Sequence, residues 1–328
     1  MSAIRNVVCL LLILCFCRSV SSYDHHELHQ FAQITAGPMG EIGPRCSQDR
    51  RLLAFEYFSS AQPNAVQVWL MPTKGKFADA KPLLGDTEKS YGEISWSPDG
   101  VWLSFIGGSP ESGGILSDQV FKINVANRQI TQLTHLPAQT ALGGTSWSRD
   151  GRILFEMDDD LYTVPQIGGA VVKLVNVQAK LPGVSPGFPS WSPDGSRVAF
   201  VGRGRSSGRP GAGHDLYIVD LPSGKIAKIL AGLGDDAPSW LDQDRILCSR
   251  IHGAAESSIW LVHVSRGSAV RLTKGSFDIS PAVCPGERDV YFARNMHVAP
   301  SRFLMEGFHI WRFKLKRSIR LATTQESD

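Results

Sequence analysis

The sequence lacks several features that mark membrane-spanning, nucleic-acid-binding and zinc-binding proteins. Its longest apolar run, at residues 7–17, holds 11 residues, whereas a helix needs roughly 20 apolar residues to cross a bilayer. No charge of one sign dominates, because 34 Lys and Arg stand against 31 Asp and Glu. Nucleic acid is therefore not an expected partner. No CxxC pair occurs among the six cysteines, so no zinc site is indicated.

The first 22 residues are typical of a secretory signal peptide. Arg5 precedes the apolar run, and Val20 and Ser22 suit the minus-three and minus-one positions of a cleavage site before Tyr23. Cleavage removes Arg5 and Arg18 and leaves a net charge of +1. We expect a periplasmic or secreted protein with no integral membrane segment in the mature chain. An uncleaved amino-terminal anchor is the alternative.

Cleavage at this point creates one candidate metal site. The new terminus reads Tyr23-Asp24-His25, and its amine, two amides and the His25 imidazole match the square-planar ligands of Cu(II) or Ni(II). A polar tail over residues 23–30 is the simpler interpretation. No other cofactor is expected.

The mature chain retains three cysteines, which are Cys46, Cys248 and Cys284. An odd number in an oxidising compartment leaves at least one thiol outside a disulfide. We do not expect these cysteines to hold the fold together.

One motif recurs along the chain. SWSPDG occupies residues 95–100, SWSRDG residues 146–151, and SWSPDG again residues 190–195. Weaker copies lie at residues 44–55, 238–247 and 281–292. We take one anchor position in each copy of the motif: Cys46, Trp96, Trp147, Trp191, Trp240 and Val283. Successive anchor positions are 50, 51, 44, 49 and 43 residues apart. The chain therefore contains six units.

Each unit is predicted to form four short antiparallel strands. Alternating apolar residues and turn residues indicate strands, and long helical periodicity is absent. A period of about 40–50 residues with four strands is typical of a β-propeller blade. We predict an all-β fold, a six-bladed β-propeller over residues 31–328. The tryptophans fill the space between blades and Asp-Gly pairs close turns, so these positions are assigned to the scaffold: Trp96, Asp99, Gly100, Trp147, Asp150, Gly151, Trp191, Asp194, Gly195 and Trp240.

The motif resembles the WD-like repeat of TolB-type propellers. W-S-P-D-G is followed by I/V-A-F, an aromatic strand and an LT-like strand, and the pattern covers residues 31 to about 324. The resemblance implies a six-bladed ring and favours a protein partner in the cell envelope or extracellular space. TolB carries an additional domain ahead of its propeller, whereas only about 20 residues are expected ahead of the first blade here.

Both ends of the repeat region resemble an outermost strand. FAQITAG fills residues 31–37 and SIRLATT fills residues 318–324. Either the amino-terminal strand closes the ring, or it adds to a sheet edge and the carboxyl-terminal strand completes the sixth blade.

Recognition is expected on the face that carries the long loops. These loops, at residues 107–118, 203–215 and 295–308, share a face with the segments that enter the inner strands, and a rigid ring presents such loops to partners. The candidate partner-binding residues are Tyr91, Glu93, Arg203, Arg205, Arg209, Asp235, Asp236, Phe303 and Leu304. Solvated loops, or apolar residues folded over a blade edge, are the alternatives.

Catalytic patterns are scarce. GVSPG at residues 183–187 imitates a nucleophile elbow, but Pro186 has no N–H to donate to an oxyanion. No histidine falls on a predicted inner strand, where mainly Ser, Pro, Gly and apolar residues occur. We therefore expect a non-catalytic binding scaffold. A hydrolase or lyase acting on carbohydrate or peptide is the alternative, and a lone sensor domain is a third.

Overall fold

A computed structural model describes most of the predicted propeller region. The described residues are 31–38, 40–59, 62–85, 91–110, 116–204, 214–233, 237–252, 256–274, 276–296 and 307–315. No helix within them is long and apolar enough to span a membrane. The predicted signal peptide and the tail with His25 lie outside them. So do six of the predicted partner-binding residues: Arg205, Arg209, Asp235, Asp236, Phe303 and Leu304.

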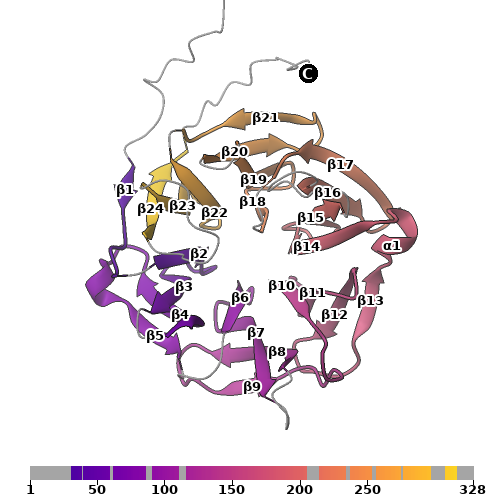
Figure 1. The fold of residues 1–328 in the computed structure, drawn as a ribbon, viewed down its shortest axis with the longest axis horizontal. Helices are drawn as coiled ribbons and strands as arrows, with labels where there is room; N and C mark the ends of the chain where they lie inside the picture. The colour runs from indigo at the N-terminus through magenta and orange to yellow at the C-terminus, as the bar shows by residue number, and fades with distance from the viewer. Residues whose placement is uncertain are drawn as a thin grey trace, which may run out of the picture.

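Sheets surround a central axis, as the alternating sequence pattern predicts (Figure 1). Four sheets each contain four antiparallel strands that follow one another in the chain. We call them blades 1 to 4. Their strands are β2 (Gly40–Cys46), β3 (Leu52–Ser59), β4 (Gln62–Pro72) and β5 (Lys81–Leu84) in blade 1; β6 (Tyr91–Trp96), β7 (Trp102–Pro110), β8 (Leu116–Asn124) and β9 (Ile130–Gln132) in blade 2; β10 (Leu142–Trp147), β11 (Arg152–Met157), β12 (Asp160–Pro165) and β13 (Val172–Val175) in blade 3; and β14 (Val184–Trp191), β15 (Arg197–Gly204), β16 (His214–Asp220) and β17 (Lys225–Ala231) in blade 4.

The fifth and sixth repeat units form one eight-stranded sheet. One half contains β18 (Ser239–Trp240), β19 (Arg245–Ile251), β20 (Ser257–His263) and β21 (Ser268–Arg271). The other, which we call the closing half, contains β22 (Phe277–Val283), β23 (Asp289–Asn295), β24 (Phe308–Lys314) and β1 (Ala32–Gln33). A parallel bridge between Ser257 and Phe277 joins the two halves.

The blade count predicted from the sequence is therefore corrected. The structure has four separate four-stranded blades and one larger sheet, rather than six separate sheets. The cause is local, because the Ser257 amide donates to the Ser276 carbonyl at 3.3 Å and the Ser257 hydroxyl donates to the Asp278 carbonyl at 2.8 Å. These bonds connect the starts of β20 and β22. The β-propeller arrangement and the four-stranded antiparallel blades are confirmed.

Short helical segments occur only between strands of the described chain. They are a 3-10 turn at Phe77–Asp79 and α1 at Val177–Lys180. In α1, the Asn176 side chain accepts a hydrogen bond from the Ala179 amide at 3.0 Å and caps the first turn.

The repeated tryptophans lie at the ends of inner strands and pack between blades. Trp96, Trp147 and Trp191 are buried, and each shares an apolar cluster with the preceding blade. The Trp96 Nε1–H donates to the Arg45 carbonyl in blade 1 at 2.9 Å. Trp240 ends β18, and its Nε1–H donates to the Ser190 carbonyl at 3.1 Å. Neighbouring sheets are thus joined by indole side chains as well as by the chain.

The Asp-Gly turns follow one geometry. In blade 4, Asp194 Oδ1 accepts hydrogen bonds from the Ser192 hydroxyl at 2.7 Å and the Ser196 amide at 3.0 Å. Gly195 has a φ of 74°, in the left-handed region that glycine adopts without strain. Corresponding turns in blades 2 and 3 contain Asp99 with Gly100 and Asp150 with Gly151.

The amino-terminal strand completes the closing half. In β1, Ala32 pairs with Arg312 and Gln33 pairs with Trp311, both on β24. Of the two closures open from the sequence, the structure therefore has the first. Residues 318–324 lie outside the described residues.

A disulfide joins Cys46 in blade 1 to Cys284, which follows β22. The expectation that the cysteines do not organise the fold is therefore wrong. The two positions are 238 residues apart, so sequence spacing alone does not indicate that they meet. Cys248 lies buried in β19.

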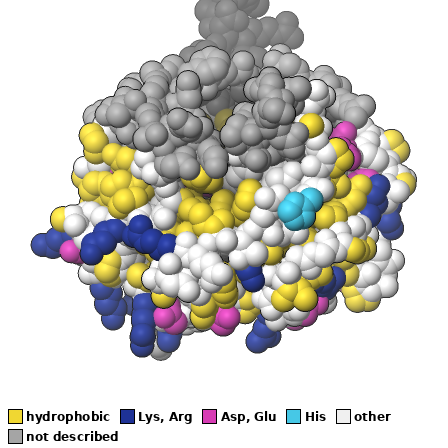
Figure 2. All heavy atoms as spheres, turned by 90° about the horizontal axis from the view of Figure 1, so that it is seen from below, with side chains coloured by type: hydrophobic (Ala, Val, Ile, Leu, Met, Phe, Trp, Pro, Cys, Tyr) yellow, Lys and Arg dark blue, Asp and Glu magenta, His cyan; other side chains and the backbone are white. Residues whose placement is uncertain are grey.

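The ring has two distinct faces. Tyr91 on β6 pairs with Gly107 on β7, and Phe277 on β22 pairs with Asn295 on β23. In these sheets the start of the inner strand therefore lies beside the end of the second strand, where the loop to the third strand begins. We call this side of the ring the entry face. The Asp-Gly turns lie on the opposite side, the turn face. Viewed edge-on, the described surface mixes basic and acidic side chains, as the nearly balanced composition predicts (Figure 2).

Candidate functional site

The inner strands share a backbone irregularity close to the axis. In β2, β6, β10, β14 and β22 the pairing register shifts before the anchor position. A residue with positive φ lies there in each strand: Gly43 (59°), Glu93 (59°), Gly144 (52°), Phe188 (50°) and Ser280 (54°). Glu93 is the charged member of this set. Side chains rarely adopt this conformation without compensation, and such residues concentrate at functional sites.

Glu93 forms a pair with Glu56, which lies on β3 in the neighbouring blade. The Glu93 amide donates to Glu56 Oε1 at 2.8 Å, and the Thr145 hydroxyl in blade 3 donates to the Glu93 carbonyl. The Glu56 carboxyl lies close to two glycines, since a Cβ at Gly92 would lie 3.4 Å from Oε1 and one at Gly43 would lie 3.5 Å from Cδ, both ordinary contact distances. Three blades thus meet at the backbone of Glu93.

Burial within the ring and, to a smaller extent, the negative charge of the Glu56 carboxyl together raise the pKa of Glu93 to about 8, against the opposing effect of Arg45 and Arg203. Burial also raises the pKa of Glu56, although the hydrogen bond from the Glu93 amide and the charge of Arg45 oppose the shift. Both side chains are partly exposed to solvent. Near neutral pH the pair therefore holds a proton in a position that solvent reaches.

Two further charged residues extend the pair toward blades 3 and 4. Glu156 on β11 and Arg203 on β15 form an ion pair, with Oε2 and Nη2 3.5 Å apart. The Arg203 guanidinium also lies 5.3 Å from the centre of the Phe188 ring, a distance at which a cation is attracted to an aromatic face. Both residues act electrostatically on Glu93.

Glycines again allow these charged side chains to approach the inner strands. A Cβ at Gly143 would lie 2.5 Å from Glu156 Oε2, and one at Gly187 would lie 2.1 Å from Arg203 Nη2. We call Arg45, Glu56, Glu93, Glu156 and Arg203 the axial cluster. It draws side chains from four consecutive blades, and its charges of both signs can bind polar or ionic groups.

Three of the predicted partner-binding residues lie within the described chain. Glu93 and Arg203 meet in the axial cluster. Tyr91 does not present its ring to solvent, because it is 8% exposed and packs edge-on against Phe105 with ring centres 5.7 Å apart.

Arg45, Glu56 and Glu156 were not predicted from the sequence. Glu56 and Glu156 each follow the phenylalanine of a second strand, Phe55 and Phe155, where the sequence pattern indicates only a strand. For Glu156 the signal was Gly143 on the neighbouring inner strand, which leaves space for a long side chain from the second strand.

No group of three or more His, Cys, Asp or Glu side chains that could hold a metal ion occurs among the residues that the structure describes.

No family model matches the sequence. The structure is similar to that of TolB from Acinetobacter baumannii, with a TM-score of 0.61 and 16% identity over 75% of this chain and 58% of that one. The fold is a β-propeller. This chain spans less than two thirds of that TolB chain.

The structure is also similar to those of two other propellers whose names state different activities. An oligogalacturonate lyase from Vibrio parahaemolyticus has a TM-score of 0.55 and 17% identity, over 86% of this chain and 79% of that one. The β-propeller domain of the Trilobed protease from Pyrococcus furiosus has a TM-score of 0.50 and 14% identity, over 84% and 81%. At these identities the similarity establishes the fold, and function has to be argued from the site.

Proposed function

We propose that the protein is an exported, non-catalytic binding propeller that engages a protein partner in the cell envelope or extracellular space through its entry face. The observation that carries this proposal is the axial cluster, to which four blades contribute charged side chains. A partner segment that enters along the axis meets carboxyl and guanidinium groups held by rigid strands. Such preorganised groups favour specific recognition.

The proposal includes the predicted organisation of the chain. Residues 1–22 act as a signal peptide, residues 23–30 as a tail, and residues 31–328 as one domain in which the halves of the eight-stranded sheet serve as the fifth and sixth blades. The Cys46–Cys284 disulfide supports export, because structural disulfides persist mainly in oxidising compartments.

A matched pair of variants on one strand tests this proposal. Arg203→Ala removes a charge of the axial cluster, whereas Arg197→Ala removes the same charge from the other end of β15, at the turn face. Both variants are produced in mature form and used to capture partners from the organism's own envelope fraction, with wild type as the reference. We expect Arg203→Ala to capture at least about tenfold less of its specific partner than wild type does, because truncating one member of an interfacial charge pair costs about 2–5 kcal/mol of binding free energy. Equal capture by both variants would contradict the proposal.

A catalytic function is a second candidate because of the Glu56–Glu93 pair. Two adjacent carboxyls that share a proton can act as a general acid and base. The substrate class would be carbohydrate or peptide, as a hydrolase or lyase requires. Turnover of a polysaccharide or peptide panel that disappears in Glu93→Gln but persists in Arg197→Ala would favour this function over binding alone.

A further inference from the structure

Basic side chains concentrate on the turn face of blade 1 and of the adjoining hairpin of blade 2. Within blade 1, the Thr73 amide donates to the Arg51 carbonyl at 3.0 Å and the Thr73 hydroxyl donates to the Arg50 carbonyl at 2.7 Å. From blade 2, Arg128 Nη2 donates to the Pro82 carbonyl at 3.1 Å. These bonds hold three turns side by side. Their exposed basic residues, which we call the basic patch, are Arg50, Arg51, Lys74, Lys76, Lys81 and Arg128.

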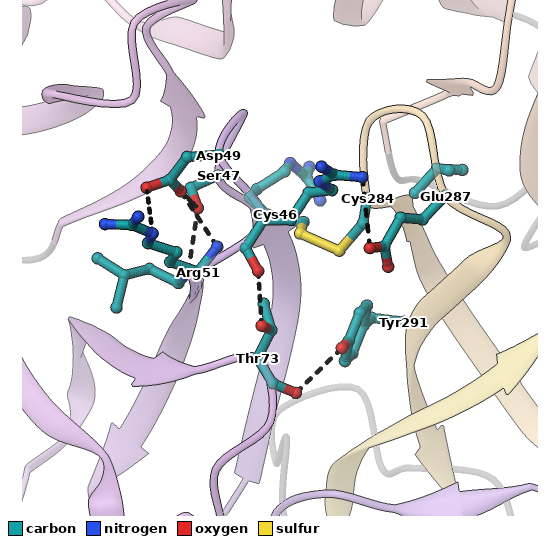
Figure 3. The surroundings of a disulfide bond; sticks show 12 residues. Cys46, Ser47, Asp49, Arg51, Thr73, Cys284, Glu287 and Tyr291 are labelled. Carbon is teal, nitrogen blue, oxygen red and sulfur yellow. Dashed lines mark hydrogen bonds and ion pairs between the residues drawn. A yellow bond between two sulfur atoms is a disulfide. The ribbon is translucent and has the colours of Figure 1, made fainter.

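Carboxylates only partly balance the basic patch. Asp49 and Asp79 accept hydrogen bonds within their own turns, and Glu287 of the closing half lies 3.5 Å from Arg50. Figure 3 shows Asp49 and Glu287 on either side of the disulfide beneath this surface. Six basic residues against these three carboxylates leave a net charge of +3.

The positive charge is local to one side of the turn face. In blade 4 the corresponding turns and their flanking residues contain Asp194 and Asp220 against Arg197 and Lys225, and carry no net charge. Seen edge-on, Lys and Arg side chains gather at the left of the described surface (Figure 2). Because the whole chain is nearly balanced, this surplus belongs to blade 1 and its neighbour rather than to the overall composition.

Exposed aliphatic side chains lie on the same face in blades 2 and 3. Val101 follows the Asp-Gly turn of blade 2 and is 40% exposed, and Ile130 begins β9 and is 49% exposed. Ile167, in the hairpin between β12 and β13, is 85% exposed. A Cβ at Gly168 would lie 3.6 Å from the Leu133 carbonyl oxygen, so this hairpin lies against blade 2. Aliphatic residues therefore adjoin the basic patch.

The connections on this face are short in all four separate blades. Those between the first and second strands are residues 47–51, 97–101, 148–151 and 192–196. Short turns of similar length at the same end of each sheet give a shallow surface. Such a surface can meet a planar partner over several blades at once.

We propose that the turn face of blades 1 to 3 docks on an anionic phospholipid bilayer. The basic patch attracts the headgroup phosphates, and each Lys or Arg near such a surface strengthens binding about fivefold. Val101, Ile130 and Ile167 enter the boundary between headgroups and acyl chains. These aliphatic residues favour a bilayer over a soluble polyanion, which offers no apolar layer. The entry face then points away from the bilayer, so this docking does not depend on the proposed binding function.

Flotation with vesicles tests the proposal. The mature chain is used, so that the apolar run at residues 7–17 does not contribute. Vesicles of phosphatidylcholine alone are compared with vesicles that also contain phosphatidylglycerol. We expect wild type to bind the anionic vesicles at least about tenfold more strongly, and high salt to weaken this preference because it screens exposed charges. Equal binding to both kinds of vesicle, or to neither, would overturn the proposal.

Two charge reversals locate the surface. Lys74→Glu alters the basic patch, whereas Lys274→Glu makes the same change at an exposed lysine that follows β21 on the entry side of the ring. We expect Lys74→Glu to bind anionic vesicles at least about tenfold less strongly than wild type, and Lys274→Glu to change by less than about twofold. Equal losses would show an effect of net charge alone and would overturn the assignment to this face.

The aliphatic contribution is separable by salt. Ile167→Ser should weaken vesicle binding at both low and high salt, because salt does not screen apolar contact. Unchanged binding by this variant would contradict insertion of the hairpin. Retention of wild type on heparin without flotation would assign the basic patch to a soluble polyanion and overturn the bilayer as its partner.

Discussion

The backbone amide of Glu93 donates a hydrogen bond to the side chain of Glu56 at 2.8 Å, so the inner strand of blade 2 is held by a carboxyl group from blade 1. The negative charge of the Glu56 carboxyl also raises the pKa of Glu93. A structural contact between blades is therefore also a site of proton binding.

Replacing Glu93 with Gln should stabilise the protein at alkaline pH. The folded-state pKa of Glu93, about 8, lies above the usual value of 4.5, so its contribution to stability is full below pH 4.5 and is lost as pH rises toward 8. Glu93→Gln removes this loss. We expect the free energy of unfolding of Glu93→Gln to exceed that of wild type by an amount that grows between pH 4.5 and pH 8. At pH 8 this difference should reach about 1–2 kcal/mol, after allowance for partial solvent exposure.

Urea unfolding at pH 5, 6, 7 and 8 measures the effect. Glu287→Gln, which alters an exposed carboxyl on the turn face, is the matched control and should show no such trend. A stability difference between Glu93→Gln and wild type that does not vary with pH would refute the assignment of the proton to this pair.

Trp96 and Trp147 should respond differently to the same substitution. Both are 7% exposed, but the Trp96 Nε1–H donates to the Arg45 carbonyl, whereas the Trp147 Nε1 has no acceptor among the described residues. Substitution of either residue by Phe removes a similar amount of apolar surface, but only Trp96→Phe also removes a hydrogen bond. We expect Trp96→Phe to cost about 1 kcal/mol more than Trp147→Phe in denaturant unfolding. Equal losses would indicate that the inter-blade hydrogen bond contributes nothing.

Arg294 and Asp278 should show strong coupling. Their side chains are 8% and 0% exposed and form two hydrogen bonds of 2.7 and 2.8 Å. Arg294→Met strands a buried carboxylate and should cost about 3–5 kcal/mol. The double variant with Asp278→Asn should be more stable than Arg294→Met alone, as a double-mutant cycle of unfolding free energies will report. If the losses in unfolding free energy of the two single variants add up to the loss of the double variant, the two side chains do not interact directly.

The Asp194 turn should weaken in acid. Hydrogen bonds from Ser192 and the Ser196 amide lower the pKa of Asp194 to about 2, so its contribution to stability is present above pH 3.8 and is lost as pH falls toward 2. Asp194→Ala should therefore cost about 1 kcal/mol at pH 7 and little at pH 2. Asp194→Asn keeps an acceptor and is the control. Thermal unfolding at both pH values tests this, and a penalty that persists unchanged at pH 2 would argue against it.

Local sequence signals were sufficient for the strands and turns. The tryptophan before an Asp-Gly turn and the alternating strand that follows each depend on neighbouring residues, so the β-propeller arrangement was predictable. The number of separate sheets was not predictable, because two hydrogen bonds from Ser257, to the carbonyls of Ser276 and Asp278, join two units that look alike in sequence.

Contacts between distant residues were the harder part to predict. Cys46 and Cys284 meet only because the ring returns to its start. Glu56 and Glu156 extend from second strands, and the Glu156 carboxyl occupies space that a Cβ at Gly143 would fill. Alternation assigns a residue to a face of its own sheet, but it does not indicate which charged side chains of different blades approach one another.

The pairing of β1 with β24 has a consequence for biosynthesis. Ala32 is made early and its partner Arg312 late, so a nascent chain has to produce nearly all its blades before this pairing can form. Domains usually mature as units during translation. For this molecule, folding is complete only when β1 pairs with β24, and a stalled or truncated chain that lacks β24 would leave β1 without this pairing.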